Sequence, residues 1–555
     1  MSGFFETHKA TLDKALEVAR TRDYWSPYPE IASGKIYGES AKDDGAAAFK
    51  SRLGKSFDLA GHPSDGGTVG KEQSPYGLEL GISYPKASPA LLLETAQNAS
   101  KNWAKASVED RTGVCLEILH RLNRHSFEMA NAVSHTTGQA FMMAFQAGGP
   151  HAQDRGLEAV TYAYAEMTRT PSSAVWTKPQ GKHDPLVLEK QFRVVPRGVA
   201  LVIGCATFPT WNSYPGLFAS LATGNAVIVK PHPGAILPLA LTVKIGREVL
   251  AEAGFDPNVL ILAADEPGSE ITKQLVADPA VRIIDFTGSN AFGDWVRENA
   301  ARDTQIYTEE AGVNSIVIAS TDNFRGMCSN IAFSLSLYSG QMCTAPQNIY
   351  VPEGGIETDE GHKDFDAVAE GIKVSVDKLL GDPDRAAGVC GAIASDATLK
   401  RVETSTGLGT VLRPSSALEN LQGARTATPV ILALRESESD AHHQEQFGPI
   451  SFIVAVADAN EAIEKAAALA AEKGAITASI YATDDETLDR AAEAFAEAGV
   501  SLSCNLTGGV FVNQSAAFSD YHVTGANPAG NAALTDAAFV ANRFRIAATR
   551  RHKAA

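Results

Sequence analysis

Cys343 is the residue in this chain best placed by its neighbours to attack a carbonyl carbon. It lies in the segment Gly340-Gln341-Met342-Cys343, between an apolar, helix-like stretch at 331–338 and an apolar run at 349–351. A thiolate is a strong nucleophile, and small neighbours let a carbonyl group approach both the sulfur and a backbone N–H. A buried, inert cysteine is the alternative, and for an isolated cysteine it is the commoner case. The residues around the rest of the predicted site decide between the two.

Two acidic segments could supply a base or a polar contact for such a nucleophile. Glu310 lies 33 residues before Cys343, just ahead of a predicted buried strand. A glutamate there can act as a general base for water if partial burial raises its pKa. Glu445 and Phe447 belong to the turn Glu445-Gln446-Phe447-Gly448-Pro449, again before a predicted strand. A solvated acidic pair and a plain turn are the respective alternatives.

A second group of residues has the pattern of a nucleotide site. Gly288, Ser289 and Gly293 follow a predicted strand and open a helix, whose N-terminal N–H groups can bind a pyrophosphate. Lys230 ends the apolar run 226–229, so it is expected at the crevice formed by the carboxyl ends of parallel strands. An ordinary strand-to-helix turn and a solvated lysine are the alternatives.

The elements that must position these residues alternate between strands and helices. Short apolar runs of the kind buried on both faces of a parallel sheet occur at 199–203, 226–229, 259–262, 281–286 and 316–318. A helix at 237–252 is among the segments that connect them. This alternation predicts a doubly wound α/β sheet.

A second alternation follows Cys343. It comprises a helix at 365–379, a strand at 450–456, a helix at 459–472, a strand at 478–481 and a helix at 485–498. Two α/β units therefore place Cys343 beside the cleft between them. Before the first unit, residues 1–75 read as an irregular extension after a short helix, and 91–167 as helices. Residues 174–195 read as a strand pair.

Composition narrows the class of protein. The chain has 555 residues, a formal net charge of -17 and a pI near 5.3, which argues against a nucleic-acid or anionic-membrane partner. Its six cysteines have no metal-ligand spacing, so no structural metal or disulfide framework is expected. We find no signal peptide and no apolar segment of roughly 20 residues. The sequence therefore predicts a cytoplasmic protein with a small-molecule partner.

Five segments occur in the order and approximate spacing of the aldehyde dehydrogenase superfamily, which the chain resembles over about residues 85–545. They are 221–231, 288–293, Glu310-Ala311-Gly312, Gly340-Gln341-Met342-Cys343 and 445–449. The closing stretches 505–514 and 517–531, with the N-terminal extension, resemble the phenylacetic acid degradation (PaaN-type) branch.

The resemblance implies an aldehyde dehydrogenase-like α/β fold with two doubly wound domains, a Rossmann-like cofactor domain and a catalytic domain, plus a small β oligomerisation unit. The implied division is 1–75 for the extension, 76–309 for the cofactor domain with the hairpin 174–195, 310–525 for the catalytic domain and 526–555 for the C-terminal oligomerisation segment. A homodimer or homotetramer is expected.

The resemblance also implies roles for the candidate residues. Cys343 would be the nucleophile and Glu310 the base that hydrolyses its thioester. Lys230 would bind the adenosine ribose, and Gly288, Ser289 and Gly293 the pyrophosphate. Glu445 and Phe447 would hold the nicotinamide riboside.

Two positions depart from the family pattern. The asparagine that helps bind the oxyanion falls on Thr207, whose hydroxyl is a shorter donor; Asn212 is nearby but lies five residues too late to match. Pro233 stands where relatives that prefer NAD often have a glutamate for the ribose hydroxyls. Without that carboxylate a 2′-phosphate meets less repulsion, so we expect NADP, with NAD as the alternative.

The implied activity is oxidation of an aldehyde to a carboxylate, with a CoA-linked, ring-opened semialdehyde from phenylacetate as the expected substrate. One alternative is a CoA-acylating dehydrogenase, which commonly lacks the glutamate expected at Glu310. A non-catalytic binding or structural protein that kept the fold is the alternative from another class.

Overall fold

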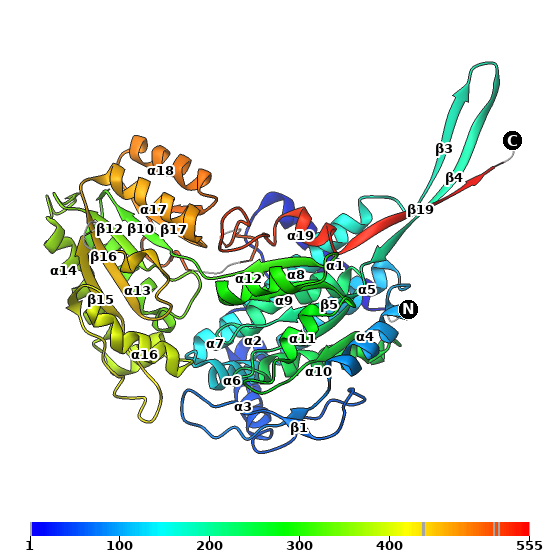
Figure 1. The fold of residues 1–555 in the computed structure, drawn as a ribbon, viewed down its shortest axis with the longest axis horizontal. Helices are drawn as coiled ribbons and strands as arrows, with labels where there is room; N and C mark the ends of the chain where they lie inside the picture. Colours follow the sequence, from blue (N-terminus) through cyan, green and yellow to red (C-terminus); the bar gives the residue numbers. More distant parts are fainter. Residues whose placement is uncertain (1–2, 436–438, 514–516, 520–521, 554–555) are drawn as a thin grey trace.

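A computed structural model describes residues 3–435, 439–513, 517–519 and 522–553 of the chain. Within the closing stretches singled out above, 514 and 520–521 lie outside the described residues. Two parallel sheets with their helices form the two halves of the body, and a narrow three-stranded sheet projects from one of them (Figure 1).

The first sheet has five parallel strands in the order β7-β6-β5-β8-β9. Alternate residues of β5 point into different helical layers: Ala200 and Val202 pack with α5 and α8–α10, whereas Val199 and Leu201 pack with α4, α11 and α12. Helices on both faces explain why these strands are continuous apolar runs. The strands are β5 (Val199–Ile203), β6 (Ala226–Lys230), β7 (Leu260–Leu262), β8 (Val281–Thr287) and β9 (Gln305–Glu309).

The helices of this half follow the predicted pattern closely, and α10 has the predicted bounds. They are α4 (Pro89–Trp103), α5 (Val108–Arg124), α6 (Ser126–Thr137), α7 (Phe141–Gly148), α8 (Pro150–Thr168), α9 (Pro209–Ala222), α10 (Leu237–Glu252), α11 (Ile271–Ala277), α12 (Asn290–Asn299) and α19 (Ala537–Ala541).

The second sheet has seven strands in the order β14-β15-β16-β12-β10-β17-β18, parallel except for β14. The run at 316–318 was expected to continue the first alternation, but it forms β10 (Ser315–Ile318) inside this second sheet. An apolar run shows that a strand is buried, not which sheet it joins. The other strands are β12 (Asn348–Pro352), β14 (Thr410–Arg413), β15 (Val430–Arg435), β16 (Ile450–Val456), β17 (Thr477–Tyr481) and β18 (Ser501–Cys504).

Helices also cover both faces of the second sheet. Ile316 and Ile318 of β10 face α13 and α14, whereas Val317 faces the side covered by α17 and α18. The helices here are α13 (Phe324–Ser336), α14 (Phe365–Leu380), α15 (Pro383–Cys390), α16 (Asp396–Thr404), α17 (Ala459–Lys473) and α18 (Asp485–Glu497). The short pair β11 (Ser320–Thr321) and β13 (Glu357–Thr358) lies apart from the main sheet.

The N-terminal extension is more helical than expected. Besides α1 (Phe4–Thr21) it contains α2 (Gly34–Tyr37) and α3 (Ala41–Lys50), followed by the pair β1 (Thr68–Val69) and β2 (Tyr84–Pro85). The sequence predicts irregular structure for the segment that forms α3. Gly45 of α3 packs directly on α6, where an added Cβ would come within 2.5 Å of the Phe127 Cβ. Tertiary packing therefore stabilises a helix whose sequence, with an internal glycine, only weakly favours one.

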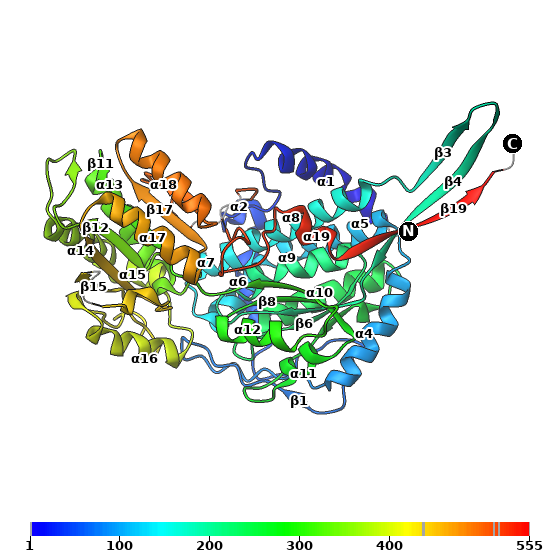
Figure 2. The same ribbon diagram turned by 45° about the horizontal axis from the view of Figure 1, so that its top comes forward.

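The projecting sheet is antiparallel, in the order β19-β4-β3 (Figures 1 and 2). It joins β3 (Ser173–Gln180) and β4 (His183–Pro196), the predicted strand pair, to β19 (Phe544–His552) from the C-terminal segment. Most of its side chains are exposed, including the large apolar side chains of Val175 and Trp176. In the part of the chain that the structure describes, no helix is long and apolar enough to cross a membrane.

Candidate active site

Cys343 lies in a loop that tertiary contacts hold in an uncommon conformation. After α13, Tyr338, Ser339 and Gly340 all have positive φ (51°, 49° and 62°). Such backbone conformations cost non-glycine residues energy and need compensating contacts. The Tyr338 hydroxyl donates to the Thr137 carbonyl (2.5 Å), and the Ser339 hydroxyl to the Ala427 carbonyl (2.8 Å).

Gly340 allows this loop to meet the 445–449 turn. A Cβ at Gly340 would lie 2.5 Å from the carbonyl oxygen of Gly448, so only glycine permits the contact. The Cys343 loop and the 445–449 turn, both singled out in the sequence analysis, are thus adjacent in space.

Asn314 holds the backbone of Cys343, a role that sequence analysis did not assign. Its amide donates to the carbonyls of Cys343 (2.7 Å) and Ala345 (3.0 Å). Its side-chain oxygen accepts from the N–H groups of Ile476 and Thr477 at the start of β17. The nucleophile loop is therefore tied to the second sheet.

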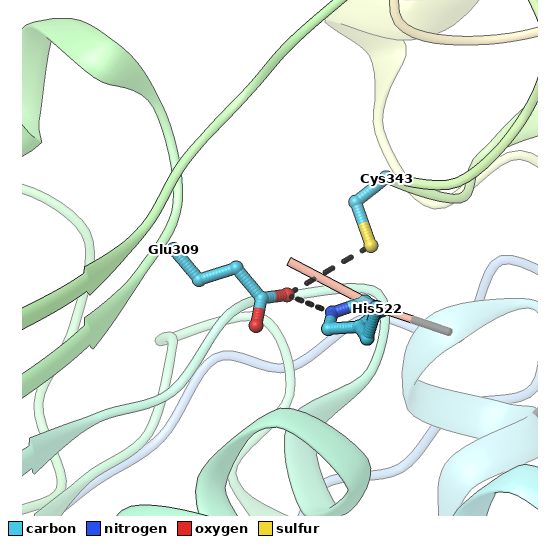
Figure 3. Close-up of side chains that lie close together, drawn as sticks. All are labelled: Glu309, Cys343 and His522. Carbon is cyan, nitrogen blue, oxygen red and sulfur yellow. Dashed lines mark hydrogen bonds and ion pairs between the residues drawn. The ribbon is translucent and has the colours of Figure 1, made fainter. Parts of the chain in front are cut away.

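The acidic residue that faces Cys343 is Glu309, not Glu310. Glu309 Oε1 lies 3.9 Å from the Cys343 sulfur, and the two side chains point toward one another across the space between the halves (Figure 3). The same oxygen accepts a hydrogen bond from Asn212 Nδ2 (2.7 Å), and His522 Nε2 lies 2.8 Å from it. The geometry thus moves the candidate base by one residue from the predicted position.

Glu310 is turned away and has a different partner. Its carboxylate is buried and paired with Arg297 of α12, and it fills the space beside Gly293. Consecutive side chains of an extended segment point to opposite sides, so only one of the two glutamates can reach the cleft. The structure therefore does not bring Glu310 to Cys343, and its role as the base stays a prediction. Gly293 is needed at least in part for this packing.

The thiol and the carboxylate have opposite pKa shifts. Burial and the neighbouring Glu309 carboxylate raise the pKa of the Cys343 thiol well above its ordinary value, while Arg155 opposes them. Burial favours a raised pKa for Glu309 as well, but the contacts with His522, Arg155 and the Asn212 amide together hold it below its ordinary value. Before substrate binds, the favoured state is therefore a neutral thiol beside a charged carboxylate that can accept its proton.

His522 and Arg155 complete this arrangement. The donor atoms of Glu309, Cys343 and His522 all lie within 4.8 Å of one another, a set that could also hold a metal ion. The guanidinium carbon of Arg155 lies 3.6 Å from the centre of a Trp211 ring, and His522 packs edge-on against Trp211. The sequence predicts no metal-ligand cluster, but that prediction rests on the spacing of ligands along the chain. Such spacing cannot reveal a cluster of residues as far apart in the chain as these.

Thr207 lies in the loop between β5 and α9. Its carbonyl accepts from Gln139 (2.8 Å), and its hydroxyl is near the Cys205 thiol, whose pKa burial raises to about 11. Among the described residues no hydrogen bond or ion pair joins Thr207 to Cys343. The predicted oxyanion donor therefore stays a prediction, and Asn212 is the amide that this loop and helix bring to Glu309.

An apolar pocket of about 350 Å³ opens over Cys343. At its far rim Glu30, from the N-terminal extension, forms an ion pair with His151 (2.8 Å) beside Gln146. The extension thus contributes to the pocket itself. The apolar wall consists mainly of Met142, Met143, Phe208, Trp211, Phe333 and Phe511.

The cofactor candidates lie at the carboxyl ends of the first sheet. Lys230, 2% exposed at the end of β6, pairs with Asp265, which follows β7 (2.7 Å). Gly288 and Ser289 lie between β8 and the start of α12, as expected. Pro233 has no carboxylate, but Asp265 supplies one next to Lys230. The expectation of NADP rested on the absence of such a carboxylate, and that premise does not hold.

Glu445 and Phe447 lie in the turn against the Cys343 loop. Burial raises the pKa of Glu445 to about 7, and Arg401 opposes the shift. Arg401 also donates to the Phe447 carbonyl (2.7 Å), and Gln347 accepts from the backbone N–H of Gln446. The turn is thus positioned by contacts from two other segments.

Comparisons with known proteins point to one family of enzymes. The sequence profile of the aldehyde dehydrogenase family matches residues 85–530. The crystal structure of an NAD-dependent aldehyde dehydrogenase from Burkholderia multivorans is 56% identical, covers 100% of this chain and 99% of its own, and superposes with a TM-score of 0.98. Aldehyde dehydrogenase LUC3 from Fusarium sp is 27% identical over 72% of this chain and 79% of its own length. Benzaldehyde dehydrogenase [NAD(+)] from Pseudomonas putida is 25% identical over 67% and 72%.

Proposed function

Because this chain belongs to the aldehyde dehydrogenase family, we propose that it oxidises an apolar aldehyde to a carboxylate through a thioester on Cys343. The observation that carries this proposal is the approach of Glu309 to Cys343 at the floor of an apolar pocket. The nucleophile, a base and a substrate volume meet at one point, which is what acyl transfer requires.

In the first half of the reaction, Cys343 gives its proton to Glu309 and its sulfur attacks the aldehyde carbon. The oxyanion that forms needs a donor, for which we propose the backbone N–H of Cys343 together with Thr207 or Asn212. NAD or NADP, when bound, supplies the acceptor for the hydride that leaves this carbon. Glu309 then releases the proton that it took from Cys343 to solvent. In the second half, the ionised Glu309 takes a proton from the water that attacks the thioester, the carbon–sulfur bond breaks, and its electron pair stays on the Cys343 sulfur.

The cofactor is NAD or NADP, and the residues present fit it. Lys230 and Asp265 would hold the adenosine ribose, the Gly288–Ser289 turn the pyrophosphate, and Glu445 with Phe447 the nicotinamide riboside. The buried Asp265 Oδ1 pairs with Lys230 at 2.7 Å. A carboxylate can also accept from a ribose hydroxyl, whereas a 2′-phosphate would meet its charge, so we propose NAD as the preferred cofactor.

The pocket supports a substrate with an apolar body. Its volume is within the usual range for ligand sites, roughly 300–1,000 Å³, and aromatic and methionine side chains line it. The resemblance to the phenylacetic acid degradation branch supports the finer proposal of a ring-opened, CoA-linked semialdehyde. The Glu30, His151 and Gln146 rim could then hydrogen-bond the amides beyond its acyl chain.

The test is a panel of aldehydes assayed with NAD and with NADP by nicotinamide absorbance. The panel should include benzaldehyde, aliphatic aldehydes and CoA-linked semialdehydes. The expected result is cofactor reduction and release of a free carboxylic acid. No reduction with any aldehyde, or reduction that persists in Cys343→Ala, would overturn the proposal.

Two alternatives remain distinguishable in the same assay. A CoA-acylating dehydrogenase would form acyl-CoA only when free CoA is added, and the placement of Glu309 beside Cys343 favours hydrolysis instead. A non-catalytic protein that kept the fold would reduce no cofactor with any aldehyde.

We also propose the division into a cofactor domain up to residue 309 and a catalytic domain from 310, with a homodimer or homotetramer formed through the projecting sheet. The exposed apolar side chains on β3, β4 and β19 support this, because such patches commonly mark interfaces. Light scattering of the full chain, compared with a Trp176→Lys variant, tests it.

A further inference from the structure

His522 and Trp211 form the wall between two cavities that meet at Glu309. On one side is the substrate pocket with Cys343, and on the other is a smaller cavity of about 90 Å³, which we call the inner cavity. Glu309 lines the inner cavity and also reaches the Cys343 sulfur. Its carboxylate therefore connects the two spaces, and His522 is next to it on this boundary.

Polar and charged side chains form part of the lining of the inner cavity, which is large enough for water. Its lining includes Arg155, Glu158, Asp285, Tyr307 and Glu309. Among the described residues, the buried Arg155 Nε and Tyr307 hydroxyl have no hydrogen-bond partner. Buried polar groups of this kind are ordinarily satisfied by water, and a water needs roughly 10–15 Å³ of such volume, so several fit.

We propose that His522 is the positioning residue and proton acceptor for Glu309 in thioester hydrolysis, and that it passes the proton to water in the inner cavity. This inference rests on the proposed function. Three observations carry it: the 2.8 Å contact of His522 Nε2 with Glu309 Oε1, the placement of both beside Cys343, and the cavity behind them with unpartnered polar groups in its lining.

The proton balance of the step is as follows. The attacking water loses a proton to Glu309 as its oxygen bonds to the thioester carbon, and the proton moves on to Nε2 of neutral His522. The resulting imidazolium stays paired with a charged Glu309. The carbon–sulfur bond then breaks, its electron pair remains on the Cys343 sulfur, and the acid leaves. The imidazolium finally releases its proton to water.

The charges around the pair favour this direction of transfer. Arg155 faces Glu309 and keeps the carboxylate ionised, so a proton received there is readily passed on. The other titratable groups near the pair are Cys343 and Cys205 on the substrate side and Glu158, Asp285 and Tyr307 around the inner cavity.

The test uses the full-length enzyme, with His522→Ala and His522→Gln, in rapid mixing with a substrate aldehyde and NAD. We expect both variants to keep the initial burst of NADH, one per active site, because acyl-enzyme formation needs only Cys343 and Glu309. Steady-state turnover should fall by roughly 10²-fold, within the range for a lost proton-transfer group. The glutamine variant keeps a hydrogen-bond donor but no basic nitrogen, so its slow turnover separates proton transfer from positioning.

Chemical rescue provides a readout that a purely structural role would not move. Added imidazole should restore steady-state turnover of His522→Ala in proportion to its concentration, whereas pyrazole, a ring of the same size but very weakly basic, should not. His362→Ala, which changes an exposed histidine paired with Glu357, is the matched control and should behave as wild type. If His522→Ala does not fold, the burst and turnover of His522→Gln alone decide.

The outcomes are distinct for the two claims. An active wild type with unchanged turnover in both His522 variants, or equal rescue by pyrazole, would overturn this inference alone. A wild type that forms no NADH with any aldehyde would overturn the proposed function and this inference with it.

Discussion

Glu309 Oε1 lies 3.9 Å from the sulfur of Cys343, across the space between the two α/β halves. Glu309 ends β9 of the first sheet, whereas Cys343 follows α13 in the second half, where Asn314 ties its loop to β17. The reactive pair therefore exists only when the two halves are assembled. The pair also depends on which of the two adjacent glutamates at the end of β9 points into the cleft.

Glu309→Gln and Glu310→Gln should separate the two adjacent glutamates. We expect Glu309→Gln to lower steady-state turnover by roughly 10²- to 10⁴-fold, because it removes the group that accepts a proton beside the sulfur. Glu310→Gln should keep turnover near that of wild type but lower the melting temperature, because it weakens the buried ion pair with Arg297. Nicotinamide absorbance and thermal melts measure the two effects. If Glu310→Gln lost turnover and Glu309→Gln kept it, Glu310 would be the base.

Glu309→Gln should also lower the pKa of the Cys343 thiol, so the thiol should become easier to ionise although turnover falls. In the wild type the Glu309 charge helps to hold the pKa of Cys343 well above its ordinary value, so little thiolate exists at neutral pH and more forms as the pH rises. Removing that charge should move the titration to lower pH. Iodoacetamide alkylation without cofactor, measured against pH, reports the midpoint, and Glu310→Gln is the matched control. An unchanged or higher midpoint in Glu309→Gln contradicts the prediction.

Asp265→Asn should shift cofactor preference toward NADP. Asp265 pairs with Lys230 at 2.7 Å, and its loss would remove a negative charge and free a lysine for a 2′-phosphate. We expect kcat/KM for NADP relative to NAD to rise on the order of tenfold, which corresponds to about 1.4 kcal/mol. Glu266→Gln is the control, because that adjacent carboxylate pairs with Lys71 instead. The same change in both variants, or none in either, would mean that Asp265 does not select the cofactor.

The parts of the structure that the sequence predicted are those set by local pattern. The bounds of β5, β16 and α10 agree with the predicted ones, because each is a run with one clear period or one uninterrupted apolar stretch. These features need no knowledge of distant contacts.

The remaining features depend on tertiary structure. Glu309 and Glu310 are chemically identical neighbours, and only the rotation of β9 decides which one enters the cleft. His522 lies far from both Glu309 and Cys343 in sequence, in the stretch 517–531, whose resemblance to one branch of the family assigns it no chemical role. Asp265 follows a different strand from Lys230, so the carboxylate that opposes a 2′-phosphate appears only once β6 and β7 are paired.

Arg543→Met should destabilise the fold more than any surface substitution in the projecting sheet. Arg543 is fully buried, and its guanidinium makes two hydrogen bonds to Asp285 (2.6 and 2.7 Å) and one to the Ser220 hydroxyl (2.8 Å). It also lies over the Tyr307 and Phe539 rings. Methionine would fill part of the space but leave Asp285 as a buried charge without its partner. Breaking a buried pair in this way costs about 3–5 kcal/mol.

Denaturant unfolding measures this loss, with Arg545→Met on the exposed part of β19 as the control. Because Asp285 lines the inner cavity as well as binding Arg543, the double variant Arg543→Met/Asp285→Asn should recover part of the lost stability. Recovery would show that the uncompensated carboxylate, rather than the lost packing on Tyr307 and Phe539, is the main cost. A double variant less stable than Arg543→Met would show that packing dominates.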